Sequence, residues 1–247
     1  MPVTHRHNLA GGFTLIELAI VIVIVGILSA VAMQKMSVSV QTAQYEQTKA
    51  EMDQLAMAVM GNPATYNDGS RADFGYVGDV GAMPPNLDAL AQNPGGFSTW
   101  QGPYVASGFA VDDFKKDAWG SAYSIVGMLL RSTGSGANID KELAASAAVL
   151  LNNSIEGVIV DADRTPPGPT YRDSISVRLS YPDGAGGLAT ASITPSANGS
   201  FAINNLPIGN RTLRVIYLPT TDTVMYPVTI YPARTVRLDI IFPTDLW

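Results

Sequence analysis

A run of 21 mostly apolar residues near the N-terminus, residues 13–33, constrains the fold of this chain more than any other feature. At the rise of an α-helix the run would extend about 31 Å, which is enough to cross the hydrocarbon core of a bilayer. Glu17 is its only ionisable residue, and a carboxylate in hydrocarbon costs at least about 2.5 kcal/mol. The sequence therefore predicts a membrane helix whose carboxylate either meets a cationic partner or reaches water at the membrane surface.

The residues before this run, 1–12, form a polar leader with no apolar core of its own. An ordinary secretory signal places its cleavage site after an apolar core, whereas a cut after Gly12 precedes the apolar run. The junction Gly11-Gly12-Phe13-Thr14-Leu15-Ile16-Glu17 resembles the processing site of type IV prepilins and type II secretion pseudopilins. The competing interpretation is a generic single-pass anchor, which requires neither the Gly-Phe junction nor an internal carboxylate.

The resemblance implies that a prepilin peptidase cuts between Gly12 and Phe13 and that Phe13 is then N-methylated. It also implies that Glu17 pairs with the new N-terminal ammonium of a neighbouring subunit during assembly. The implied partners are other pilin or pseudopilin subunits, the peptidase, an inner-membrane assembly platform and membrane lipid. The implied location is the bacterial inner membrane, crossed once, with the body in the periplasm or on an extracellular filament. One departure is Gln34, where many members of the family carry a proline.

The helix is predicted to continue beyond the membrane, because residues 34–60 contain neither Pro nor Gly. Met52, Leu55, Ala56 and Val59 recur with the spacing of one buried helical face. Gly61 begins a Gly-Asn-Pro stop. We therefore expect a single N-terminal helix over residues 13–61, with residues 13–33 in the membrane or in a filament core.

Residues 62–153 are predicted to form a small pilin-like α/β head. It would open with a loop over residues 64–85, rich in turn formers, followed by a short helix over residues 86–91 capped by Asn86. Residues 100–105 and 116–125 are similar to the Gly-Pro-Tyr and Asp-Pro-Trp-Gly-x-Pro-Tyr stretches of the major pseudopilin. We expect Trp119 and Tyr123 to pack the small sheet of the head onto the helix.

In those pseudopilins a loop after the sheet binds calcium, and the corresponding residues here are 131–140. Asp140 and Asn138 are the candidate ligands, although calcium usually takes 6 to 8 oxygens and several carboxylates. The alternative is a plain Gly/Ser turn leading into a helix over residues 141–152. No other cofactor is expected.

Residues 154–247 change to short β-rich runs separated by turn residues, and they predict an all-β sandwich of about seven strands. The segment from Asn198 to Leu213 resembles a hairpin of carboxypeptidase regulatory-like, transthyretin-type domains, with Phe201 and Ile203 facing inward. The expected fold class is thus α+β: a long helix, a small head and a sandwich. The predicted strands cover residues 157–160, 175–179, 191–193, 200–203, 212–217, 226–230 and 236–242.

Composition excludes several classes of function. The chain has no cysteine, a net charge of −6 and a pI near 4.8, which argue against thiol chemistry and against a nucleic-acid partner. Both histidines, His5 and His7, lie in the leader, so the processed chain has no imidazole base. Asp112, Asp113, Asp161 and Asp163 are interpreted as solvated turn carboxylates. No phosphate-binding loop occurs, and we predict that the protein is not an enzyme.

The sequence predicts a structural protein, a pilin-like or pseudopilin subunit that is processed, assembled and displays the sandwich. The extra domain favours a minor subunit, and the sandwich would contact a surface protein or a glycan. The alternative is a membrane-tethered protein whose sandwich binds a ligand without forming filaments. A type IV pilus and a type II secretion system both fit the sequence.

Overall fold

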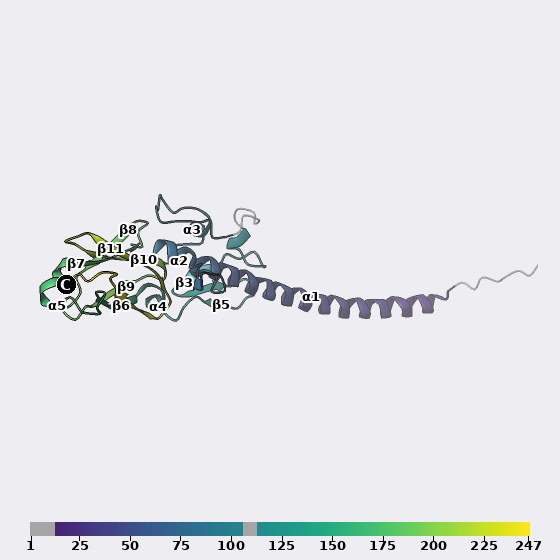
Figure 1. Ribbon diagram of the computed structural model, residues 1–247. Coiled ribbons are helices and arrows are strands. Elements are labelled where there is room, and N and C mark those ends of the chain that lie inside the picture. Colours follow the sequence, from purple (N-terminus) through teal and green to yellow (C-terminus); the bar gives the residue numbers. More distant parts are fainter. Residues whose placement is uncertain (1–12, 106–112) are drawn as a thin grey trace, which may run out of the picture. The chain divides into compact units, whose positions relative to one another are not determined.

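The computed structural model describes residues 13–105 and 113–247, which Figure 1 colours from purple to yellow. The chain divides into two compact units, Met1–Glu46 and Gln47–Trp247. Helix α1, Leu15–Met60, begins in the first unit and ends in the second. Met52, Leu55, Ala56 and Val59 are all buried, which confirms the predicted stripe and the predicted long helix.

Polar side chains fix the C-terminal end of α1. They contact the carbonyl groups of its last residues and the backbone amides that follow the helix. Arg71 Nη2 donates to Met60 O at 2.6 Å and to Gly61 O at 3.0 Å, and burial lowers the pKa of the Arg71 guanidinium. Asp73 accepts from the amides of Asn62 and Gly75. Gly61 has φ +79°, and a Cβ there would lie 2.3 Å from Asp73 O. The predicted helix stop is therefore confirmed, and only glycine fits it.

The head elements follow in short segments. Its described residues form two sheets, a β1–β2 hairpin and an antiparallel sheet of order β3-β4-β5. The bounds are β1 Tyr66–Asn67, β2 Ser70–Arg71, α2 Gly75–Val80, α3 Asp88–Ala91, η1 Asp113–Lys115, β3 Ser124–Val126, β4 Leu129–Ser132, β5 Ile139–Glu142 and α4 Ala147–Leu151.

Two predictions for the head were wrong. Residues 64–85 are not simply a loop, because they contain α2, whose Tyr76, Val77 and Val80 are buried in the head core. Gly75 and Gly78 lower the helix propensity of this segment, so the sequence did not predict the helix. Residues 141–152 are not one helix, since β5 extends to Glu142 and α4 begins only at Ala147. The amide of Asn86 does support α3, with Oδ1 accepting from Ala89 N at 3.2 Å.

All seven predicted strands of the C-terminal region form, in two sheets that face a shared core. One sheet has the order β11-β10-β7-β8 and the other β12-β6-β9, with β12 parallel to β6. The predicted inward residues Phe201 and Ile203 are buried in this core. The bounds are β6 Asn153–Val160, α5 Gly168–Tyr171, η2 Arg172–Ser174, β7 Ile175–Pro182, β8 Leu188–Ile193, β9 Ser200–Leu206, β10 Gly209–Tyr217, β11 Asp222–Ile230 and β12 Thr235–Ile241.

The head and the sandwich have separate hydrophobic cores, and contacts from several turns of the sandwich join the two. Ile208, between β9 and β10, is fully buried and belongs to the core of the head. Its amide donates to Leu150 O at 2.9 Å, and the amide of Ala233 donates to Val149 O at 3.1 Å. The turn residue of the sandwich thus completes the packing of the head.

Arg211 of β10 crosses the same boundary. Its Nη2 donates to Gly78 O of α2 at 2.7 Å and to Ile208 O at 3.2 Å. Burial lowers the pKa of Arg211 to about 10, opposed by the nearby Asp79 carboxylate. Asp79 itself is partly desolvated, which raises its pKa, and it accepts from Tyr104 Oη at 2.8 Å. The bond from Arg211 to Gly78 O holds α2 against the first residues of β10.

Candidate functional site

The start of α1 is a local polar motif followed by apolar helix. Thr14 Oγ1 accepts from the Glu17 amide at 3.3 Å, and Thr14 O accepts from the Leu18 amide at 3.1 Å. Thr14 thereby satisfies one of the amides that the first turn leaves without an intrahelical partner. The Thr-x-x-Glu spacing is that of a capping box, a signal in the sequence that identifies Thr14 as well as Glu17.

Glu17 occupies the third position of the helix, where the partial positive charge of the helix N-terminus favours a carboxylate. Phe13 lies one turn earlier and is 80% exposed. Phe13, Thr14 and Glu17 therefore lie together at one helix end. The other half of the predicted cleavage site, Gly12, lies outside the described residues, as do Asp112 and the two histidines.

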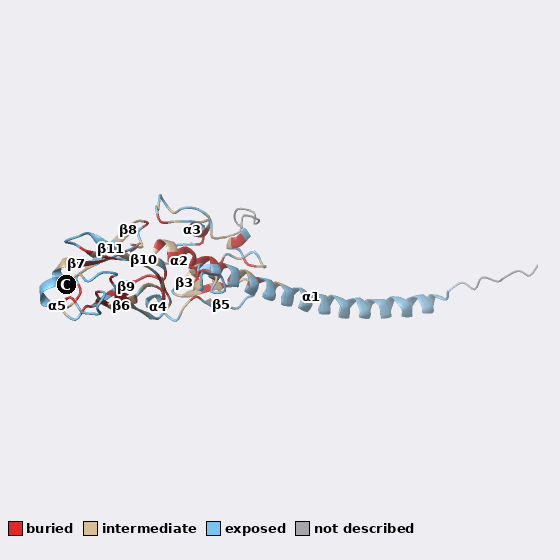
Figure 2. Ribbon diagram, viewed as in Figure 1, coloured by how far each residue is buried: buried red, intermediate tan, exposed pale blue. Residues whose placement is uncertain are grey.

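The first half of α1 carries an unpartnered apolar surface, drawn pale blue in Figure 2. Leu15 is 91% exposed, and Ile16, Leu28 and Met33 are each more than half exposed. Among the described residues, α1 is the one helix long and apolar enough to cross a membrane. Such a surface requires either lipid or other apolar helices around it.

Residues 8–33 match the family described as the prokaryotic N-terminal methylation motif. The chain carries a prepilin-type methylation motif. The match spans the candidate cleavage site, Phe13, Glu17 and the apolar run, so the first part of the predicted resemblance is confirmed. The match includes Glu17, the carboxylate within the apolar run that a generic anchor does not require.

Comparisons beyond the methylation motif give partial overlaps only. No curated protein matches the sequence. The Bacillus anthracis TIE protein is 13% identical over 49% of this chain and 24% of its own, with a TM-score of 0.30. BcpA, the major pilin subunit of Bacillus cereus, is 14% identical over 49% of this chain and 40% of its own, with a TM-score of 0.23. Overlaps at these TM-scores carry no argument about function.

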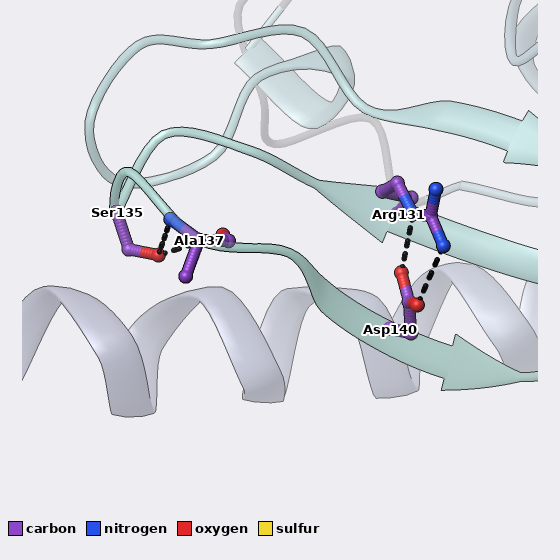
Figure 3. Close-up of polar contacts among 4 residues, drawn as sticks. All are labelled: Arg131, Ser135, Ala137 and Asp140. Atoms are coloured by element: carbon purple, nitrogen blue, oxygen red, sulfur yellow. Dashed lines mark hydrogen bonds and ion pairs between the residues drawn. The ribbon is translucent and has the colours of Figure 1, made fainter.

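The calcium candidates lie on a hairpin rather than around a cavity. Asp140 is on β5, and its two carboxylate oxygens accept from Arg131 Nε at 2.7 Å and Nη2 at 2.8 Å (Figure 3). The Arg131 guanidinium lowers the pKa of the Asp140 carboxyl. Ser135 Oγ donates to Ala137 O in the turn between the strands. Calcium binding at Asp140 and Asn138 therefore stays a prediction, and it would require Arg131 to leave both carboxylate oxygens.

A buried carboxylate that the sequence did not single out organises the same loop. Asp117 is 4% exposed. Its Oδ1 accepts from the amides of Trp119 and Ser121, and its Oδ2 accepts from Ser132 Oγ and the Gly134 amide. Asp117 thus ties the β4–β5 turn to the loop that precedes β3.

Tyr123 confirms its predicted role. Its hydroxyl donates to Glu51 Oε2 of α1 at 2.8 Å, while its ring is buried in the core of the head. Burial raises the pKa of the Tyr123 hydroxyl, and the bond to Glu51 raises it further. Trp119 is partly buried against the same core.

The interpretation of Asp161 as a solvated carboxylate was wrong. Asp161 is fully buried at the end of β6, where Oδ1 accepts from the Thr165 amide at 2.8 Å. Its contact with the Asp245 carboxyl raises the pKa of Asp245. Asp163 and Asp113 are exposed, as predicted. Among the described residues, no group of three or more His, Cys, Asp or Glu side chains is placed to hold a metal ion.

Proposed function

We propose that the protein is a pilin-like structural subunit, cut after Gly12, whose α1 packs into the core of a filament. The observation that carries this proposal is the methylation motif at the start of an apolar, unpartnered helix. The proposal extends to a minor subunit of a type IV pilus or type II secretion filament, because the sandwich adds bulk beyond the head. The body would lie in the periplasm or on the filament surface.

The partners that this function requires follow from the chemistry of the helix. A prepilin peptidase would expose the Phe13 ammonium, and a second subunit would bring that ammonium to Glu17. In hydrocarbon such a pair offsets the cost of the buried carboxylate. A membrane-tethered receptor is the alternative function, since an apolar helix anchors it equally well. Such a receptor would not need Glu17 for contacts between subunits.

The processing step gives the first test of the proposal. We expect the mature chain to begin at Phe13, shorter by twelve residues, and to carry an N-methyl group. Intact-mass and N-terminal sequencing of the protein from membranes measure both features. Gly12→Trp should leave the full-length chain in the membrane, because the peptidase must approach the backbone closely. A mature chain that begins at Met1, or after residue 33, would contradict the proposal.

Glu17 gives the second test, which separates the filament subunit from the tethered receptor. Glu17→Gln keeps a polar side chain at the third position of the capping box but removes the charge. We expect membrane insertion to be retained and incorporation into filaments to fall about tenfold or more, because the partner ammonium is left unpaired. Quantitative blotting of sheared filaments against membranes measures the split. Glu46→Gln, beyond the apolar run, is the matched control.

Equal incorporation of the Glu17→Gln and wild-type chains would mean that no partner charge is neutralised at this position. Glu17 would then be a capping residue that reaches the membrane surface, and the receptor function would be favoured.

A further inference from the structure

The outer face of the four-stranded sheet has an unusual pair of charges at its centre. Arg178 of β7 and Arg214 of β10 are directly opposite in the antiparallel register. Both are exposed, and their neighbours Val177, Leu179, Leu213 and Val215 point into the core. Opposed residues on one face have Cβ atoms about 5 Å apart, so the two side chains start from neighbouring positions on the sheet.

No carboxylate compensates these charges from the same face. The outward positions of the described strands β7, β8, β10 and β11 include no Asp or Glu. Neither guanidinium forms an ion pair with any carboxylate among the described residues. Arg178 Nε donates to Ser176 Oγ at 3.1 Å, which fixes its side chain along the strand. This concentration of positive charge occurs in a chain of net charge −6.

Opposed like charges destabilise a sheet pair, and a bound anion between them would reverse that effect. Guanidinium groups bind carboxylate and sulfate-like oxygens through paired hydrogen bonds. We propose that this face of the sandwich binds an acidic polysaccharide, with Arg178 and Arg214 holding its carboxylate groups.

The surroundings of the two arginines favour a sugar polymer over other polyanions. Hydroxyl groups lie on both sides of Arg178 along β7 and on the adjacent β8, with Ser180 Oγ and Thr190 Oγ1 3.1 Å apart and Ser176 Oγ and Ser192 Oγ 3.3 Å apart. Hydroxyls both donate and accept, which suits the hydroxyls of a sugar. Two cations are few for a nucleic acid, whose binding depends on neutralising many phosphates.

Binding is tested with the full chain in detergent micelles and with polygalacturonate as the probe, at low and at physiological salt. We expect polygalacturonate to bind and neutral dextran of similar length to bind far more weakly. Arg178→Gln and Arg214→Gln should each weaken polygalacturonate binding about tenfold or more. Arg237→Gln is the matched control, because Arg237 is an exposed arginine on β12, opposite Glu156 of the other sheet. It should leave binding unchanged.

A second variant separates loss of binding from loss of folding. Ser192 lies opposite Arg178 in the register, so Ser192→Asp adds a carboxylate that pairs with Arg178. We expect its thermal midpoint to equal or exceed that of the wild type while polygalacturonate binding falls.

The proposal is overturned if the arginine variants bind polygalacturonate as the wild type does, or if dextran binds equally well. Tighter binding of single-stranded DNA than of polygalacturonate at the same salt would also overturn it. The assay does not depend on filament formation, so it can fail while the proposed function holds, and the reverse is equally true.

Discussion

Asp117→Ala is expected to lower the free energy of unfolding of the head by about 3 kcal/mol or more. The substitution removes the acceptor for four donors, the amides of Trp119, Ser121 and Gly134 and the hydroxyl of Ser132. A buried donor left without a partner costs about 1–3 kcal/mol. The loop before β3 and the β4–β5 turn would lose their connection together.

Urea unfolding of the full chain in detergent, followed by tryptophan fluorescence, measures this effect. Asp117→Asn should show a smaller loss, since the amide keeps one acceptor oxygen but places an NH2 group against other donors. Asp113→Ala removes an exposed carboxylate four residues earlier and should change stability by less than about 0.5 kcal/mol. If Asp117→Ala resembled this control, the four hydrogen bonds would not be what holds the loop.

Long periodic segments of the fold could be predicted from the sequence because one physical signal dominates in each. The stripe from Met52 to Val59 and the alternation at Phe201 and Ile203 reflect burial of one helical or sheet face. The Gly61 stop could be predicted because a residue with positive φ ends a helix there.

The sequence failed where tertiary contacts override local preference. Helix α2 contains two glycines and reads as a loop, yet Tyr76, Val77 and Val80 are buried against α1 and the sandwich turn. Residues 139–142 form a strand because β4 pairs with them. No local sequence pattern predicts this pairing.

The candidate site divides in the same way. The Gly12–Phe13 junction and Glu17 lie within six residues of one another, so their motif can be identified from the sequence alone. The four partners of Asp117 span residues 119–134, and the opposition of Arg178 and Arg214 requires the strand register. Neither arrangement has a spacing rule that identifies it from the sequence.

The isolated sandwich, residues 153–247, is expected to fold on its own, whereas the head without it is expected to lose most of its stability. The sandwich has a core made of its own residues, including Ile155, Val177, Leu213 and Ile240. The head core lacks a fully buried side chain when Ile208 is removed, and a large cavity of this kind costs about 2–5 kcal/mol. Removal also leaves Leu150 O and Val149 O without their donors.

Two truncated chains test this asymmetry. The fragment of residues 153–247 should unfold in urea in one cooperative transition. A chain that stops at residue 152 should still insert in the membrane and be cut after Gly12, since both depend on the N-terminal segment, but its head should be rapidly digested by protease. Ile208→Ala in the full chain reproduces the packing loss without removing the sandwich, and it should destabilise the head while leaving the core of the sandwich intact. A broad transition of the fragment would show that the sandwich depends on the head, and the division into two domains near residue 154 would then be wrong.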